Sequence, residues 1–229
     1  MGAVAATGKR RGPMIFLAYV VGAQEANCYV VGDEESREAL VIDPGENAPE
    51  LLEQFREHDL RVTAVLATHH HLDHTGSLHE LLDALPDASF YMHELDYPRI
   101  AEQISRASAR TGGELTPPRE PDRFLDHGDQ IEAGGRTFTA LHCPGHTPGS
   151  LCLYTPGQRA GESSGDGPGL IAAIHEHLLT LPGETIVFPG HNQATTIRDE
   201  YSLNPFLHDP DLTAGRRRWL TRGRRPAVS

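Results

Sequence analysis

The segment Thr68–His74 (THHHLDH) concentrates side chains that bind metal ions. It follows directly after Val62–Ala67, a short apolar run typical of a buried strand. Ligands at the end of a strand are held in place by the sheet, which metal binding requires. In an extended or turning chain, His69 and His71 project to similar sides and offer two neutral imidazoles to one ion.

Asp73 and His74 stand at the start of the helix predicted after this segment, where they can face a second, neighbouring ion. Imidazole and carboxylate ligands together suit zinc, iron or manganese, and the sequence does not choose among them. The alternative is a polar surface run or a tag-like stretch of histidines. Such a run does not normally lie between an apolar strand and an amphipathic helix, so we interpret the segment as a metal site.

Two further histidines also follow predicted strands and lie among small or turn-forming residues. His146 lies in HCPGHTPGS (His142–Ser150), and His191 ends the run FPGH (Phe188–His191). A single histidine in such a position is more often structural than a ligand. Three groups of histidines at strand ends in one chain are difficult to explain in that way, and they indicate a shared metal site.

The elements that must position these residues alternate between strands and helices twice along the chain. Strands are predicted at Met14–Val21, Ala26–Val31, Ala39–Ile42, Val62–Ala67, Ser89–Met92, Gln130–Ala133, Arg136–Leu141, Ser150–Tyr154 and Thr185–Phe188. Helices are predicted after Asn47, from about Gly76 to Leu85, over Glu94–Arg110 and across the apolar positions between Leu170 and Leu181. Because no Rossmann-type glycine fingerprint accompanies this alternation, it indicates a layered α/β domain with mixed sheets covered by helices.

Composition and charge restrict the class of protein. The 229 residues are 38% hydrophobic and 23% charged, as in an ordinary globular chain, and no apolar run is long enough to span a bilayer. The formal net charge of -12 disfavours a broad nucleic-acid surface, and the arginines between 216 and 225 are interpreted as a solvated tail. Three cysteines without paired spacing favour a reducing compartment. We expect a cytoplasmic protein without nucleic-acid or membrane partners, and a flexible extension at residues 1–13.

The motifs THHHLDHTG (Thr68–Gly76), HCPGHTPGS and FPGH together resemble the glyoxalase II branch of the metallo-β-lactamase superfamily. The stretches 27–45 and 194–207 are similar to that family too, so the resemblance covers about residues 14–208. It implies a four-layer αββα sandwich, here a single domain over residues 14–229, with the metals at one edge between two sheets. Carried over by motif, the residues that hold the first ion are His69, His71 and His146, and those that hold the second are Asp73, His74 and His191.

The resemblance assigns no ligand role to His70, although a triple histidine is common in this motif. The other histidines match no ligand position either, and we expect them to be surface or structural residues: His58, His79, His93, His127, His142, His175, His177 and His208. Cys143, which precedes His146 in its motif, is expected to pack beside the metals rather than to bind them.

One ligand of the family is missing from its expected place. The resemblance implies an aspartate that bridges the ions, after an apolar strand and before a glycine-rich loop, but residues 155–167 contain no apolar run to form that strand. Gly165-Asp166 resembles the bridging pair, yet it adjoins the helix predicted near Gly169. We therefore interpret Asp166 as the far end of the loop, and as a bridging ligand only in the alternative. Either the molecule keeps a compromised or single-ion site, or the natural chain contains residues that this sequence omits.

The resemblance implies a metal-dependent hydrolase in which a metal-bound hydroxide attacks a carbonyl carbon and Asp73 orients it. Zinc is the expected metal, as two ions in the family pattern or one ion here, with iron or manganese as alternatives. A thioester or related acyl compound is the expected small-molecule substrate, because a thiolate leaving group needs little protonation. The glutathione-binding helical domain of glyoxalase II is not evident after His191, so the thiol and the oligomeric state stay open.

Three other hypotheses stay open as well. Some relatives bind one iron and oxidise persulfides, which would make the chain a mononuclear-iron dioxygenase. The superfamily also contains nucleic-acid hydrolases, which the net charge of -12 and the lack of a long inserted clamp disfavour. A chain without the bridging segment could also bind metal with impaired turnover. Metal analysis and thioester hydrolysis, measured on one sample, would separate these hypotheses.

Overall fold

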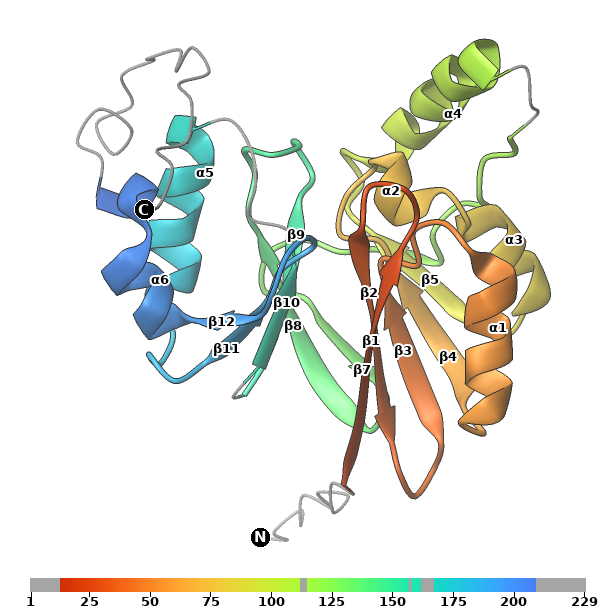
Figure 1. Ribbon diagram of the computed structural model, residues 1–229, viewed down its shortest axis with the longest axis horizontal. Helices are drawn as coiled ribbons and strands as arrows, with labels where there is room; N and C mark the ends of the chain where they lie inside the picture. Colours follow the sequence, from red (N-terminus) through yellow and green to blue (C-terminus); the bar gives the residue numbers. More distant parts are fainter. Residues whose placement is uncertain (1–12, 112–114, 157, 162–166, 209–229) are drawn as a thin grey trace, which may run out of the picture.

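The computed structural model describes residues 13–111, 115–156, 158–161 and 167–208. Within these residues, the strands form two six-stranded sheets that face each other (Figure 1). The predicted basic tail lies outside the described residues, and so do Asp166 and all of the predicted N-terminal extension except Pro13.

The first sheet contains its strands in chain order. They are β1 (Met14–Val21), β2 (Ala26–Asp33), β3 (Glu38–Ile42), β4 (Arg61–Leu66), β5 (Ser89–Met92) and β6 (Arg123–Phe124). The neighbours β1, β2 and β3 are antiparallel, whereas β3 to β6 run parallel to one another. Helices connect the parallel strands, and the carboxyl ends of these strands therefore meet at one edge of the sheet.

The second sheet has the order β12-β11-β10-β9-β8-β7. Its strands are β7 (Gln130–Ala133), β8 (Arg136–His142), β9 (Leu151–Thr155), β10 (Gln158–Gly161), β11 (Ile186–Phe188) and β12 (Thr195–Thr196). All neighbouring pairs are antiparallel except β10 and β11, which are parallel. The loop between β8 and β9 and the turn after β11 carry the two remaining histidines of the predicted site.

Helices lie on the outer side of each sheet (Figure 1). On the side of the first sheet these are α1 (Ala48–Glu57), α2 (Leu72–Thr75), α3 (Leu78–Ala84) and α4 (Tyr97–Thr111). On the side of the second they are α5 (Gly167–Ala173), the π-helical turn η1 (Ile174–Leu178), α6 (Ile197–Leu203) and the 3-10 turn η2 (Pro205–His208). The predicted four-layer αββα sandwich is confirmed. No helix in the described part of the chain is both long and apolar enough to cross a bilayer.

The strand β2 shows why an inner strand is mostly apolar on both of its faces. All of its residues are buried. Cys28 and Val30 belong to a core cluster with Leu81 of α3, whereas Tyr29 and Val31 belong to a second cluster between the two sheets. Successive residues of a strand point to opposite faces, so a strand covered on both sides needs apolar residues in both alternating sets. A third cluster lies between the second sheet and α5.

The prediction that residues 155–167 form no strand is wrong. β10 pairs with β9 on one side and with β11 on the other. Its sequence, QRAG, has no apolar pattern, so backbone hydrogen bonds to both neighbours determine the strand rather than its own composition. The strands β6 and β12 lie at the edges of their sheets and contain two residues each, which is too short for an alternating pattern that would predict a strand.

Two helix predictions also need correction. The helix expected from Glu94 begins at Tyr97, because the preceding residues form a turn in which the Asp96 N–H bonds to the His93 carbonyl at 3.1 Å. The helix expected between Leu170 and Leu181 changes at Ile174 from α5 into the π-helical turn η1. The short helix α6 was not predicted.

Candidate metal centre

The segment that carries four of the predicted ligands leaves the carboxyl end of β4. Asp43, which directly follows β3, accepts hydrogen bonds from the backbone N–H and the hydroxyl group of Thr68, both at 2.7 Å. These bonds fix the start of the segment beside the end of β3. The side chains of His69 and His74 are consequently buried, and both residues are at most 1% exposed.

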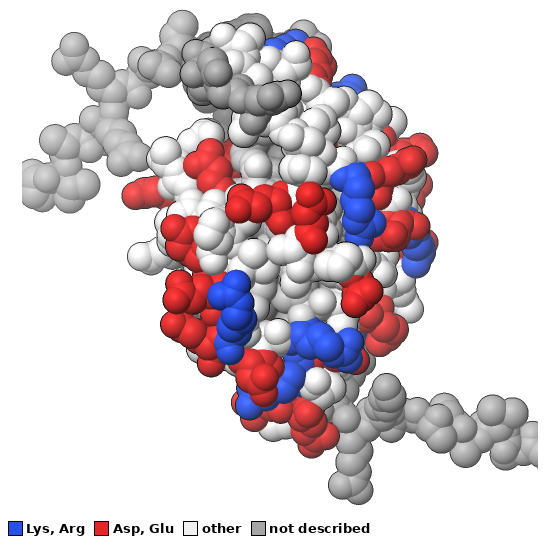
Figure 2. All heavy atoms as spheres, turned by 90° about the vertical axis from the view of Figure 1, so that its right-hand side faces the viewer, with Lys and Arg blue, Asp and Glu red and all other residues white. Residues whose placement is uncertain are grey.

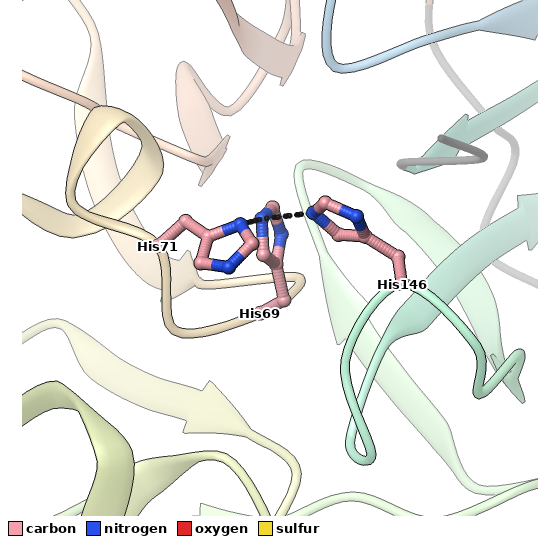
Figure 3. Close-up of side chains that lie close together, drawn as sticks. All are labelled: His69, His71 and His146. Carbon is pink, nitrogen blue, oxygen red and sulfur yellow. Dashed lines mark hydrogen bonds between the residues drawn. The ribbon is translucent and has the colours of Figure 1, made fainter. Parts of the chain in front are cut away.

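His69, His71 and His146 form the first cluster (Figure 3). His69 Nε2 lies 3.0 Å from His71 Nδ1 and 3.1 Å from His146 Nε2. His71 precedes α2, whereas His146 comes from the loop between β8 and β9 in the other sheet. The structure thus brings together three histidines from both halves of the sandwich, as the sequence predicts.

The hydrogen bonds around His69 decide which of its ring nitrogens can bind a metal. Thr68 donates its hydroxyl hydrogen to Asp43, so the hydroxyl oxygen accepts from His69 Nδ1, which lies 3.0 Å away. The lone pair of the neutral ring therefore lies on Nε2, the atom that faces His71 and His146. This tautomer is the one that metal binding at the first cluster requires.

The spacing of these nitrogens also fits a metal ion. Ligand nitrogens about 2.0–2.1 Å from one ion lie about 2.9 Å apart at a right angle and about 3.4 Å apart in a tetrahedron. The two separations from His69 Nε2, 3.0 and 3.1 Å, fall within this range. Three imidazoles are a donor set for a divalent transition metal.

Asp73, His74 and His191 form the second cluster. Asp73 Oδ2 lies 3.1 Å from His191 Nε2 and 3.4 Å from His74 Nε2, and the two nitrogens are 3.3 Å apart. The rings of His69 and His74 are neighbours, with centroids 4.4 Å apart. The two clusters therefore lie side by side, and a ligand bound at one of them is within reach of the other.

The first sheet positions His191, although that residue follows a strand of the second sheet. The side-chain amide of Asn27, in β2, donates to the carbonyls of Pro189 and Asn192 at 2.9 and 2.8 Å. The Asn27 backbone N–H donates to the Gly190 carbonyl at 2.7 Å. Sequence reasoning missed this role of Asn27. The available signal was a polar residue inside an otherwise apolar strand.

Asp43 orients the second cluster as well. Its Oδ2 accepts a hydrogen bond from His74 Nδ1 at 3.1 Å, which leaves His74 Nε2 to face Asp73 and His191. Because Asp43 already accepts bonds from Thr68 and His74, it supports the ligands rather than serving as one. Sequence reasoning missed this role too, and the signal was an aspartate directly after the apolar strand β3.

The two clusters differ in the protons that they hold without metal. Burial, followed by the charge of neighbouring histidines, keeps the pKa of His69 well below its usual range and lowers the pKa of His71 to about 4. Burial disfavours the charged form of His74, but the charge and hydrogen bond of Asp43 outweigh burial and raise its pKa to about 10. Burial likewise opposes ionisation of Asp73, but the hydrogen bond and charge of His74 lower its pKa to about 2. At pH 7, His69 and His71 are therefore neutral, whereas His74 and Asp73 are a charged pair.

His70 belongs to none of the candidate metal groups in the described part of the chain, and its Nδ1 instead lies 2.9 Å from Asp96 Oδ2. Cys143 is buried and is also absent from those groups, as far as the described residues show.

His93, Asp126 and His142 form a separate group with metal-like spacing. The backbone N–H of Leu95 donates to His93 Nδ1 at 3.1 Å, so the hydrogen of neutral His93 lies on Nε2, which faces Asp126 at 3.7 Å. A metal would need the lone pair of that nitrogen. We therefore interpret His93 and His142, whose rings stack at 4.3 Å, as a structural pair.

Comparison with known proteins gives a consistent result. The model of the metallo-beta-lactamase superfamily matches residues 21–160. An uncharacterised protein of Aquifex aeolicus is 40% identical over 208 residues, which cover 84% of this chain and 97% of that protein. The hydroxyacylglutathione hydrolase GloC of Haemophilus influenzae is 33% identical over 204 residues, which cover 82% of this chain and 95% of GloC. The crystal structure of TTHA1623 in a di-iron-bound form has a TM-score of 0.72 and 33% identity, over 83% of this chain and 100% of that one.

The range matched by the family model contains five of the six residues of the two clusters and ends within β10. The sixth, His191, follows later in the chain, and the structure places it 3.1 Å from Asp73. The family match extends over more than half of the chain, and the relatives align over nearly their whole length. The chain therefore belongs to the metallo-beta-lactamase superfamily.

Proposed function

We propose that this chain is a metal-dependent hydrolase that cleaves thioesters or related acyl compounds. The observation that carries the proposal is the adjacency of two unlike clusters, one of three imidazoles and one of a carboxylate with two imidazoles. Such a pair can hold the reacting carbonyl and the attacking water next to each other. The relative named hydroxyacylglutathione hydrolase supports the substrate class, because glutathione is a thiol and its acyl derivatives are thioesters.

Divalent ions held by the six cluster residues would supply Lewis acidity, which polarises a carbonyl group and lowers the pKa of water. We propose zinc, since imidazole and carboxylate ligands in this number suit it. Iron is the alternative, because TTHA1623 was solved in a di-iron-bound form. The donor atoms of the two clusters suit either metal.

Asp73 is proposed to act in the reaction as well as in metal binding. Its low pKa, about 2, keeps the carboxylate ionised at neutral pH, so it can accept a hydrogen bond from the attacking water and orient it. Its side chain keeps 13% exposure, so it is not sealed from solvent. A thiolate leaves without prior protonation more readily than an alkoxide, because a thiol has a pKa of about 8.5. A thioester therefore depends less on an additional general acid than an oxygen ester does.

The surface supports a small molecule as the substrate. Figure 2 shows the right-hand face of Figure 1, where acidic side chains are spread over the surface with basic ones among them. Together with the net charge of -12, this distribution disfavours the approach of a polyanionic nucleic acid. The odd number of cysteines favours the cytoplasm as the location of the reaction.

The test is a comparison of acyl thioesters with matched oxygen esters on protein loaded with zinc, iron or manganese. We expect the thioester to be hydrolysed faster, the rate to fall on chelation, and the same metal to restore it. Turnover that chelators do not affect would overturn the metallohydrolase proposal. Oxygen uptake with a persulfide in the iron-loaded sample, without thioester hydrolysis, would instead identify an oxidoreductase.

A further inference from the structure

A single buried carboxylate joins the two loops that carry the first metal cluster. Asp96, in the turn before α4, is 0% exposed. Its Oδ2 accepts hydrogen bonds from the backbone N–H and the Nδ1 of His70, at 3.0 and 2.9 Å, and from the hydroxyl of Thr147 at 2.6 Å. Its Oδ1 accepts from the Gly149 N–H at 2.8 Å. Four donors from two distant segments therefore converge on one side chain.

The donors are adjacent to the predicted ligands. His70 lies between His69 and His71 in the segment after β4, and Thr147 directly follows His146 in the loop between β8 and β9. The first segment belongs to one sheet and the second loop to the other. A shift of either one would change the separation between His146 Nε2 and His69 Nε2, which is 3.1 Å.

The packing around Asp96 is as close as its hydrogen bonding. A Cβ atom added to Gly149 would lie 2.9 Å from Asp96 Oδ1 and 3.0 Å from its Cγ, so the approach requires a glycine. Thr147 is itself held by Ser150, whose hydroxyl accepts from the Thr147 N–H at 3.0 Å. The loop between β8 and β9 therefore has little freedom to compensate for a change at Asp96.

The charge of Asp96 is part of this arrangement. Burial opposes ionisation, but the hydrogen bonds from His70 and Thr147 outweigh it and lower the pKa of Asp96. Hydrogen bonds to an ionised carboxylate are shorter and stronger than those between neutral groups. An amide at this position would present hydrogens to at least one of these donors and so break the set.

We propose that Asp96 is a positioning residue that sets the separation of His146 from His69 and His71, and thereby the metal affinity of the first cluster. His70 is then a donor to Asp96 rather than a ligand, which explains the middle histidine of the triple. The Leu151 N–H also bonds to the Thr68 carbonyl at 2.9 Å, but this bond lies at the base of the two loops, away from His146. The inference concerns metal binding and does not depend on the proposed substrate.

Asp33, the last residue of β2, offers a matched control for Asp96. Asp33 accepts hydrogen bonds from the backbone N–H groups of Glu35 and Ser36, at 3.1 and 2.8 Å, and a Cβ on Gly135 would lie 2.9 Å from its Oδ2. It is 9% exposed and belongs to no candidate metal group of the described residues. Asp33→Asn therefore removes a comparable carboxylate without touching the loops of the first cluster.

The experiment measures zinc affinity by competition with a chromogenic chelator, in a His191→Ala background that leaves only the first cluster complete. We expect Asp96→Asn to weaken zinc binding roughly 10- to 100-fold, as is typical for groups that orient metal ligands. Asp33→Asn is expected to lower the melting temperature and leave zinc affinity unchanged. The visible spectrum of bound cobalt, which reports ligand geometry, should change only in Asp96→Asn.

Two variants of Thr147 test the same proposal even if Asp96→Asn does not fold. Thr147→Val removes one donor to Asp96 and should weaken zinc binding, whereas Thr147→Ser keeps the hydroxyl and should restore it. Zinc affinity within two-fold of the parent protein in both Asp96→Asn and Thr147→Val, or an equal loss in Asp33→Asn, would overturn the proposal. Either result would show that Asp96 contributes only to general stability.

Discussion

The two metal clusters lie side by side, yet their metal-free states differ. The first contains His69 and His71, whose low pKa values leave them neutral, with the Nε2 lone pair of His69 already directed inward. The second contains Asp73 and His74, which are both ionised. Asp43 and Asp73 raise the pKa of His74, and His74 in turn lowers the pKa of Asp73. An ion can enter the first cluster without displacing a proton, but an ion that enters the second must displace one.

One segment, Thr68–His74, therefore serves the two ions unequally. A neutral cluster attracts a cation only through its lone pairs, whereas a carboxylate adds charge and makes affinity sensitive to pH and to the neighbouring ion. Two dications close together repel, so a second ion needs negative charge nearby. Among the described residues of the second cluster, Asp73 is the ligand that supplies it. We expect the first cluster to keep its ion more tightly than the second.

The largest effect should follow removal of a ligand from the first cluster. His146→Ala should lose the tightly held ion, and the rate of thioester hydrolysis should fall roughly 1000-fold, since a catalytic metal contributes several kcal/mol of transition-state stabilisation. The measurements are elemental analysis after dialysis and kcat/KM on an acyl thioester. His79→Ala, in α3 and outside both clusters, is the control and should retain both properties. Equal metal content in the two variants would contradict the assignment of His146.

A smaller effect is expected from Asp73, because its replacement leaves the first cluster complete. Asp73→Asn should lower kcat roughly 100-fold or more, through loss of an orienting base and of the charge that favours the second ion. One ion should remain bound. Asp83→Asn, an exposed carboxylate of α3 with 70% side-chain exposure, is the matched control. Loss of both ions in Asp73→Asn would contradict this expectation, since the clusters would then not bind metal independently.

The pH dependence of metal binding separates the clusters without any substitution. The pKa of His74, about 10, lies above the assay pH, so binding at the second cluster releases a proton and its apparent affinity rises with pH up to that value. The expected rise is about ten-fold per pH unit for one released proton. The pKa of His71, about 4, lies below the assay pH, so His71 adds no such rise at the first cluster. Chelator competition at pH 7 and pH 8 measures both affinities, and an equal response of the two ions would contradict the difference.

The local patterns predicted a layered α/β domain and a shared site for the groups of histidines, and the family resemblance implied the αββα sandwich. His69, His71 and His74 follow the buried strand β4, and His146 and His191 follow strands of the other sheet. Because such strand ends meet at one edge, local patterns were enough to suggest a common location. The family resemblance then assigned the residues to two ions, an assignment that stays a prediction.

The supporting residues could not be predicted, because their partners are far away in the chain. Asn27 donates hydrogen bonds to the turn at 189–192. Asp96 accepts hydrogen bonds from His70 and Thr147, which are 26 and 51 residues away in the sequence. A single asparagine or aspartate carries no local pattern that reveals such a partner. β10 was not predicted for a related reason. Its strand conformation depends on pairing with β9 and β11, and its own residues show no strand pattern.

The smallest effect is expected at the carboxylates that follow β10 in the sequence. If Asp166 is the end of a shortened loop rather than a bridging ligand, Asp166→Ala should leave the number of bound ions and the rate unchanged. Glu162→Ala, at the position directly after β10 in the sequence, tests the other carboxylate of this stretch and should also have no effect. Elemental analysis of both variants, after the intact mass has been matched to 25.0 kDa, measures the outcome. Loss of one ion in either variant would identify the missing bridging charge.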